Sequence, residues 1–162
     1  MKRLLLLAVV TLLVGVTVSF DFRGSNAPEQ GISQSIQDRF VGAWRLAWLE
    51  EEGADGRVHR ADCTGLLVYT PDGHMSVQVM YRNPQLGGRT ASAQYAHAGY
   101  EASFGTYEID ETANTFTFHV EGALVRSLVD KRLTRVFQLS GNQLIVKSYN
   151  RNEHWRVGWE RD

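Results

Sequence analysis

Cysteine is almost absent from this chain, since Cys63 is the only one in 162 residues. A single cysteine forms no intramolecular disulfide, so a disulfide-stabilised fold is excluded and the domain must rest on its apolar core. We interpret Cys63 as a small buried residue. A free thiol that joins two chains is the alternative.

A charge excess is also missing, because the net charge is -1. Nucleic-acid-binding domains carry a clustered basic surplus, so we expect no nucleic-acid partner. The sequence has no glycine-rich phosphate loop, no nucleophile elbow and no Cys-His pair. No two of its histidines show the spacing of metal ligands, and we expect neither a metal nor a cofactor. These histidines are His59, His74, His97, His119 and His154.

A long apolar run occurs only at the start of the chain. Lys2 and Arg3 precede an uncharged run over residues 4–19, which is the layout of a secretory signal. Residues 1–20 are therefore a cleaved signal peptide or an uncleaved membrane anchor that tethers the protein through residues 4–19. Either reading predicts a periplasmic or secreted protein. Residues 21–38 are polar and small and are typical of a flexible linker.

The remaining residues, 39–162, read as short strands separated by turns. After a short helical turn at 36–40, Trp44, Leu46 and Trp48 alternate with smaller or charged side chains. Pro71-Asp72-Gly73 and Gly141-Asn142 are typical turn sequences. Eight strands are predicted, within 40–49 and at 64–70, 74–81, 104–110, 115–123, 133–140, 143–149 and 154–161.

Eight consecutive antiparallel strands predict an all-β fold, a single up-and-down barrel. Closure removes both sheet edges, and a barrel of this size is just wide enough for one small ligand. The insertion at 82–103 contains an alanine-rich stretch between Thr90 and Gly99. We expect a short helix there that covers the mouth of the barrel.

Two hairpins have a predictable register. Tyr69 should face Met75 across the first turn, and Tyr107 should face Phe118 in the hairpin about residues 111–114. Each hairpin then has one apolar face. In the second hairpin the opposite face collects the polar side chains of Thr106, Glu108, Thr117, His119 and Glu121.

Gly42-Ala43-Trp44 resembles the G-x-W that opens the first strand of lipocalins, a family in which an arginine of the last strand lies across the tryptophan. The alternation of the last strand assigns that place to Arg161, with Gly42, Trp44 and Arg161 forming the closed end. From about Val41 onward the chain is similar to the lipocalin-like domain family of bacteria and fungi. The similar segments are residues 42–46, 65–78, 104–110 and 119–122.

The chain departs from that family at two places. Phe118-His119 stands where two histidines are expected, and Arg126-Ser127-Leu128 stands where a Pro-Asn-Trp run is expected. These departures indicate a different ligand if either element shapes the family's site. The resemblance implies an internal cavity for a small, largely apolar molecule. Some lipocalin-type barrels act as isomerases or cyclases.

Several side chains on the apolar faces are candidates for ligand contact. Aromatic residues there are cavity walls or plain core, and an inward arginine binds a carboxylate or lies at an exposed strand end. The candidates for the ligand site are Trp48, Tyr69, Tyr107, Phe118, Arg135 and Trp155.

His119 and Glu121 are the catalytic candidates. A histidine beside a carboxylate is the minimum for proton transfer. The alternative is that both belong to the polar outer face of their hairpin. They serve catalysis only if they face the cavity.

We therefore expect the barrel to bind a small hydrophobic molecule outside the cytoplasm, as a carrier or by sequestration. The first alternative is a cofactor-free isomerase or cyclase that uses His119 with Glu121, or Tyr107, for proton transfer. The second is an envelope protein that binds another protein through the barrel surface and has a filled interior.

Overall fold

The computed structural model describes residues 35–83 and 93–161. The chain divides into two units, Met1–Ile32 and Ser33–Asp162, and the fold below is that of the second. The predicted signal or anchor at 1–20 and most of the predicted linker lie outside the described residues. Among the described residues, no helix has the length and apolar character needed to cross a membrane.

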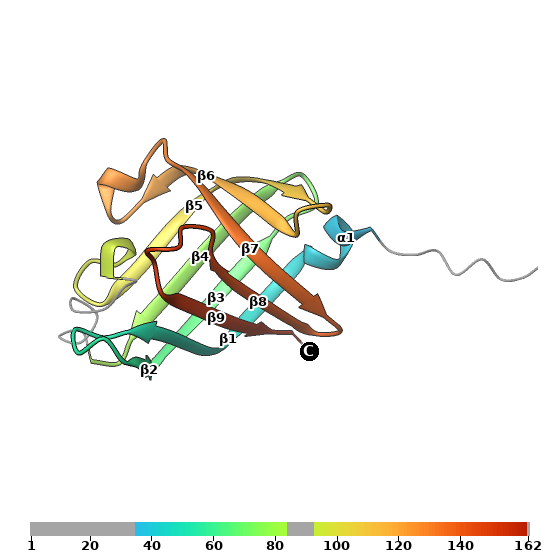
Figure 1. The fold of residues 1–162 in the computed structure, drawn as a ribbon. Helices are drawn as coiled ribbons and strands as arrows, with labels where there is room; N and C mark the ends of the chain where they lie inside the picture. The colour runs from blue at the N-terminus through green and yellow to red at the C-terminus, as the bar shows by residue number, and fades with distance from the viewer. Residues whose placement is uncertain (1–34, 84–92, 162) are drawn as a thin grey trace, which may run out of the picture. The chain divides into compact units, whose positions relative to one another are not determined.

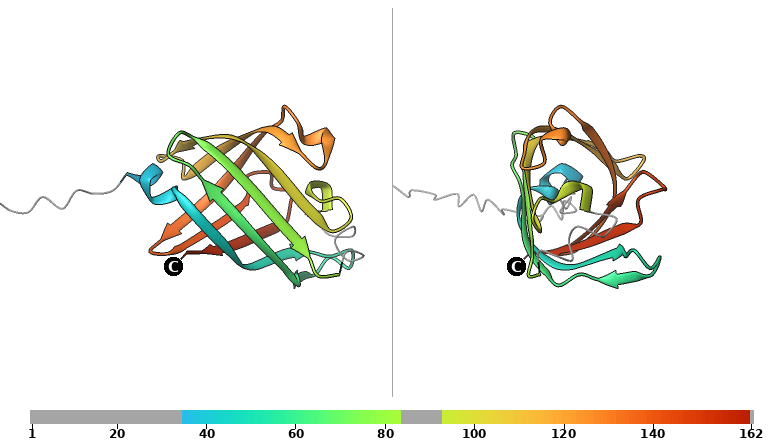
Figure 2. Two further views of the ribbon diagram at one scale, coloured as in Figure 1. Left: turned by 180° about the vertical axis from the view of Figure 1, so that it is seen from behind. Right: turned by 90° about the vertical axis from the view of Figure 1, so that its left-hand side faces the viewer.

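The strands form one antiparallel sheet that closes on itself (Figures 1 and 2). The first strand pairs with the last, so β1 and β3 to β9 make the closed eight-stranded barrel that the sequence predicts. Seen from one end in the right-hand view of Figure 2, the strands surround a common interior. The strands are β1 (Gly42–Glu52), β2 (Val58–Arg60), β3 (Cys63–Tyr69), β4 (His74–Tyr81), β5 (Tyr100–Asp110), β6 (Thr115–Ala123), β7 (Arg132–Ser140), β8 (Gln143–Ser148) and β9 (Trp155–Glu160).

The short strand β2 is an addition to the predicted set. The sequence suggests that a polar turn ends the first strand near Glu50, but β1 continues to Glu52 and β2 pairs with its last three residues. The turn between them has Gly56 at a φ of 71°, and Asp55 accepts a hydrogen bond from the backbone N–H of Arg57 at 3.1 Å. Aspartate and glycine favour such a turn, which returns the chain onto β1.

The predicted hairpin registers are confirmed. Tyr69 pairs with Met75 in β3 and β4, and Tyr107 pairs with Phe118 in β5 and β6. Both pairs are buried, so the apolar face of each hairpin is the inner face of the barrel, and the polar set on the other face points outward.

Three short helical segments lie at the ends of the barrel. In Figure 1, α1 (Ile36–Phe40) lies at one end, and the 3-10 turns η1 (Ala93–Tyr95) and η2 (Arg126–Leu128) lie at the other. The α1 segment is the predicted helical turn, begun by Ser35, which accepts from the backbone N–H of Asp38. The helix predicted from Thr90 is described only from residue 93. There it is a single 3-10 turn, and Ala98 and Gly99 further along have positive φ angles of 50° and 75°, which do not occur in a helix.

The α1 end of the barrel is closed by aromatic packing. Trp44 is fully buried, and its indole N–H donates to the carbonyl of Phe40 at 2.8 Å. The guanidinium carbon of Arg161 lies 4.5 Å from the centre of the Trp44 ring, and Nη1 donates to the carbonyl of Val41 at 3.1 Å. Gly42 has a φ of 128°, which a side chain would strain. The ring of Phe40 packs against those of Tyr69, Tyr107, Phe116 and Phe137.

Candidate functional site

The interior between this closed end and the opposite end contains a cavity of about 90 Å³. Tyr95 of η1 and Leu128 of η2 line it on one side, and Tyr69 and Phe116, which touch Phe40, line it on the other. The cavity therefore occupies the half of the barrel away from α1. Most of its wall is apolar, including Leu67, Met75, Val79, Phe118, Val146 and Val157.

Arg135 of β7 places a positive charge in this apolar wall. The side chain lines the cavity, and the residue is only 9% exposed. Its guanidinium carbon lies 5.0 Å from the ring centres of both Tyr95 and Trp155. These two rings are nearly perpendicular, with centres 6.1 Å apart. They form a corner that holds the guanidinium by cation–π attraction.

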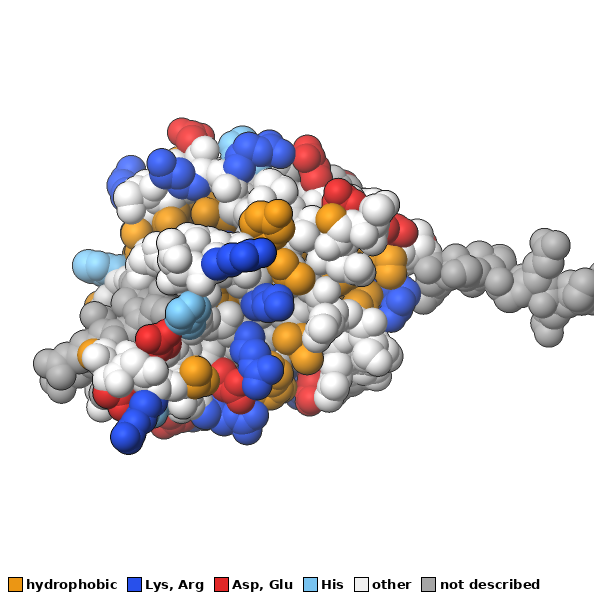
Figure 3. Space-filling view, in the orientation of Figure 1, with side chains coloured by type: hydrophobic (Ala, Val, Ile, Leu, Met, Phe, Trp, Pro, Cys, Tyr) orange, Lys and Arg blue, Asp and Glu red, His pale blue; other side chains and the backbone are white. Residues whose placement is uncertain are grey.

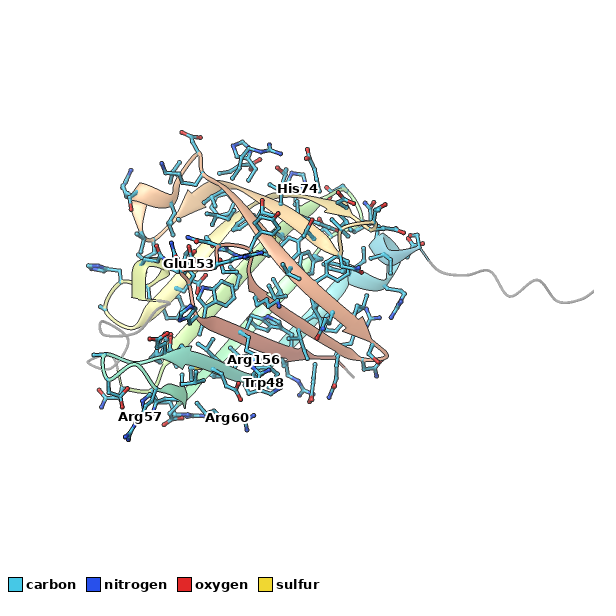
Figure 4. The ribbon with its side chains drawn as sticks, viewed as in Figure 1. Trp48, Arg57, Arg60, His74, Glu153 and Arg156 are labelled. Atoms are coloured by element: carbon cyan, nitrogen blue, oxygen red, sulfur yellow. The ribbon has the colours of Figure 1, made fainter. Side chains whose placement is uncertain are left out.

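Glu153 fixes the two rings of this corner. Its carboxylate accepts hydrogen bonds from the Tyr95 hydroxyl at 2.7 Å, the Trp155 indole N–H at 3.2 Å and the Asn150 amide at 3.1 Å. Burial acts to raise the pKa of Glu153, but these hydrogen bonds, led by that from Tyr95, lower it below its usual range. Glu153 therefore remains ionised and holds the rings in place. Figure 4 shows Glu153 toward the end of the barrel opposite α1.

Glu101 of β5 is the second charged group in the cavity wall. Burial raises the pKa of its carboxyl to about 7, although the positive charge of Arg135 acts in the opposite direction. The carboxyl thus changes protonation state near neutral pH, inside a largely apolar space.

Tyr69 adds a polar group without a partner. Its hydroxyl is buried and has no hydrogen bond to any residue that the structure describes, and burial raises its pKa well above the ordinary value. An unsatisfied buried hydroxyl costs free energy. Because Tyr69 lines the cavity, a molecule bound there would lie next to this residue.

The structure brings four of the six predicted ligand-site residues to the cavity wall, namely Tyr69, Phe118, Arg135 and Trp155. Tyr107 lies at the closed end instead. Its ring stacks on Phe40 at 6.4 Å, and its hydroxyl donates to the carbonyl of Thr70 at 3.2 Å. The Tyr107 hydroxyl is therefore satisfied within the protein.

Trp48 lies on the outer side of the barrel, which corrects its predicted place in the cavity wall. A β-bulge between Leu46 and Trp48 reverses the inward and outward alternation of β1, as an extra residue does. Trp48 then lies over Gly158 and between two arginines, with guanidinium carbons 5.8 Å (Arg60) and 5.5 Å (Arg156) from the ring. Figure 4 shows Trp48 beside Arg156, and Figure 3 shows basic side chains gathered on this outer face.

His119 and Glu121 also face away from the cavity. His119 pairs with Thr106 and with Arg132 on the outer side, between the inward residues Phe118 and Val120, and Glu121 is exposed. The proton-transfer hypothesis required both side chains to reach the interior. Their neighbours in the strand take the inward positions, so this pair does not meet that condition.

Sequence reasoning missed Glu101, Ser103 and Tyr95, which all line the cavity. The signal for the first two was present, because positions 101, 103, 105 and 107 share one face of a strand. The predicted strand began at 104, whereas β5 begins at Tyr100. Tyr95 had no comparable signal because it lies in a 3-10 turn. No group of three or more potential metal ligands occurs among residues 35–83 and 93–161.

A family model described as a lipocalin-like domain matches residues 41–161. A lipocalin-like protein from Bacteroides uniformis has 16% identity and a TM-score of 0.45, over 76% of this chain and 99% of that chain. An uncharacterized protein from Bacteroides eggerthii has 14% identity and a TM-score of 0.45, over 76% and 99%. A redesigned β-barrel has 11% identity and a TM-score of 0.42, over 78% and 94%. No curated protein matches.

Proposed function

This chain belongs to the lipocalin-like domain family, and on that premise we propose that it binds a small, largely apolar molecule inside the barrel. The observation that carries the proposal is the cavity of about 90 Å³ with an apolar wall and a few inward polar groups. Small-molecule sites combine these two features, since the apolar wall supplies affinity and the polar groups supply orientation. An interaction module with a filled interior would lack such a space.

The cavity limits the size of the enclosed part of the ligand. Its volume of about 90 Å³ exceeds the roughly 30 Å³ share of one water molecule and is below the roughly 150 Å³ of a cavity that holds benzene. A short hydrocarbon chain fits this space better than a large ring system. Affinity should rise with each added methylene, by up to about 0.8 kcal/mol, until the cavity is full.

Titration calorimetry of the full-length chain with butan-1-ol, hexan-1-ol and octan-1-ol tests the proposal. We expect saturable binding that strengthens with chain length until the cavity is full. Val146→Phe places a larger ring in the cavity wall and should abolish binding. Ile145→Phe is the matched control, because residue 145 is the adjacent, outward-facing position of β8. Absence of saturable binding, or equal binding by the two variants, would contradict the proposal.

No observation favours the isomerase or cyclase alternative through His119 and Glu121, because both side chains lie on the outer face. Tyr107 is also unsuited to it, since its hydroxyl is engaged with the backbone at the closed end. The binding proposal therefore stands without a catalytic component.

A further inference from the structure

Arg135 has no anionic partner among the described residues. No carboxylate in this part of the chain lies within the 4.0 Å that defines an ion pair with its guanidinium. Its polar contacts are a 3.3 Å hydrogen bond to the carbonyl of Thr134 and an interaction with the Tyr95 hydroxyl. A guanidinium has five N–H donors in a planar fork. Several of them therefore remain available on a residue that lines the cavity.

The neighbours of Arg135 hold its position without neutralising it. Tyr95 and Trp155 contact the guanidinium through their rings. The carboxylate oxygens of Glu153 accept hydrogen bonds from Tyr95, Trp155 and Asn150 instead. A buried positive charge that forms no ion pair with a described carboxylate is costly unless an anion binds to it. The site is thus preorganised for an anion that arrives from the cavity side.

Among the described residues, Glu101 is the one negatively charged group that shares the cavity wall with Arg135. Its pKa of about 7, raised by burial, lets the carboxyl take up a proton near neutral pH at little cost. Once protonated it no longer repels an anion, and its O–H becomes a donor. The other ionisable groups that line the cavity, Tyr69 and Tyr95, are neutral, because burial raises the pKa of both.

We propose that the ligand of this barrel is a small monocarboxylate, with its carboxylate held by the guanidinium of Arg135 and its short hydrocarbon body in the apolar cavity. The inference rests on the proposed function and gives it a substrate class. A planar guanidinium fork and a carboxylate form two parallel charge-assisted hydrogen bonds, which a neutral head group does not reproduce. The apolar wall, including Val79, Phe118 and Val146, excludes water from the rest of the molecule.

Calorimetric titration of the full-length chain with hexanoate, hexan-1-ol and hexylamine at pH 7 tests the assignment. The three probes share one hydrocarbon body and differ in head-group charge. We expect hexanoate to bind at least about tenfold more tightly than hexan-1-ol, in line with the strength of charge-assisted hydrogen bonds. Hexylamine should bind most weakly, because it brings a second positive charge to Arg135.

Three arginine variants test whether Arg135 itself, and not another arginine of β7, sets the preference for hexanoate. Arg135→Met should bind hexanoate no better than hexan-1-ol and should keep the affinity for hexan-1-ol, since methionine preserves an apolar wall. Arg132→Met is the matched control. Arg132 is an exposed arginine of the same strand that pairs with Glu108 at 3.1 Å on the outer face, and its loss should leave the preference intact. Arg135→Lys keeps the positive charge but loses the planar guanidinium. Its preference for hexanoate should be intermediate between those of Arg135→Met and Arg132→Met.

A variant of Glu101 keeps the proposal falsifiable if Arg135→Met fails to fold. Glu101→Gln removes the competing carboxyl, so it should bind hexanoate at least as tightly as the unchanged protein and without proton uptake. Equal affinity for hexanoate and hexan-1-ol in the unchanged protein, or a preference for hexanoate that survives in Arg135→Met, would overturn the carboxylate assignment and leave the proposed function standing. Failure of every probe to bind would overturn the proposed function itself.

Discussion

At the scale of single residues, the carboxyl of Glu101 links the stability of the barrel to pH. Burial raises its pKa from 4.5 to about 7, with Arg135 opposing the shift. A raised carboxyl pKa means that the folded state favours the protonated form. The stabilisation that protonation provides is therefore complete below about pH 4.5 and is lost as pH rises through about 7.

Glu101→Gln should remove this pH dependence. Between pH 4.5 and 7.5, the free energy of unfolding of the unchanged protein should fall relative to that of the variant, by at most about 3 kcal/mol. Urea unfolding at several pH values measures the free energy of unfolding of the unchanged protein and of the variant. Glu108→Gln is the control, because Glu108 is a largely exposed residue of the same strand. Parallel pH profiles for the unchanged protein and Glu101→Gln would contradict the assignment.

Single side chains were predictable from sequence where strand alternation was regular. Arg135 stands out as a charge among Leu133, Phe137 and Leu139, and it lines the cavity. Trp48 was placed wrongly because a bulge leaves no mark in the residue pattern. Glu101 was missed because β5 begins four residues before the predicted strand, so the alternation that places position 101 on the inner face was not extended to it.

At the scale of elements, the bulge in β1 depends on a glycine in β9. A Cβ placed on Gly158 would lie 2.3 Å from Cε2 of Trp48. No real side chain tolerates that approach, so glycine at position 158 allows the indole to lie flat over β9 beneath Arg156. The Nε of Arg156 also donates to Glu50 at 2.6 Å, which keeps its guanidinium beside the ring.

Gly158→Val should destabilise the protein by about 1–3 kcal/mol, because the new side chain displaces Trp48. In a Trp48→Ala background the same change should cost less, since the space is then free. Chemical unfolding of the two single variants and the double variant measures this coupling. Strictly additive free energies would show that Gly158 is not required by Trp48.

Turn chemistry explains why the hairpins were predictable and the ends of the barrel were less so. Pro71-Asp72-Gly73 and Gly141-Asn142 fix the register of their strands through local backbone preferences, and the observed pairs agree with them. The turn η1 places Tyr95 over the cavity through contacts with residues of distant strands, namely Trp155 of β9 and Arg135 of β7. Such long-range packing has no local signature in sequence.

At the scale of the whole molecule, the two halves of the barrel differ in how their interior is filled. The α1 end is filled by Phe40 and Trp44, both fully buried, and is covered by Arg161. The other half keeps a cavity that ends at Tyr95 and Leu128. The closed end supplies stability through aromatic packing and cation–π contact, which leaves the opposite half free to accept a ligand.

The division was partly visible in the sequence. The resemblance of Gly42-Ala43-Trp44 to the lipocalin opening, together with the alternation of the last strand, placed Arg161 near Trp44 at one end. The remaining volume of the interior was not predictable, because it depends on how side chains from β3 to β9 fill the space between them. An alternation pattern identifies the inward residues and says nothing about the gaps that they leave.

The position of a bound probe shows whether the ligand lies inside the barrel. We would measure intermolecular nuclear Overhauser effects between hexanoate and the methyl groups of the full-length chain by NMR. We expect contacts from the hydrocarbon body to Val79, Val146 and Val157, which line the cavity. Contacts confined to outward-facing methyl groups such as that of Ile145, or no contacts under saturating hexanoate, would contradict binding inside the barrel.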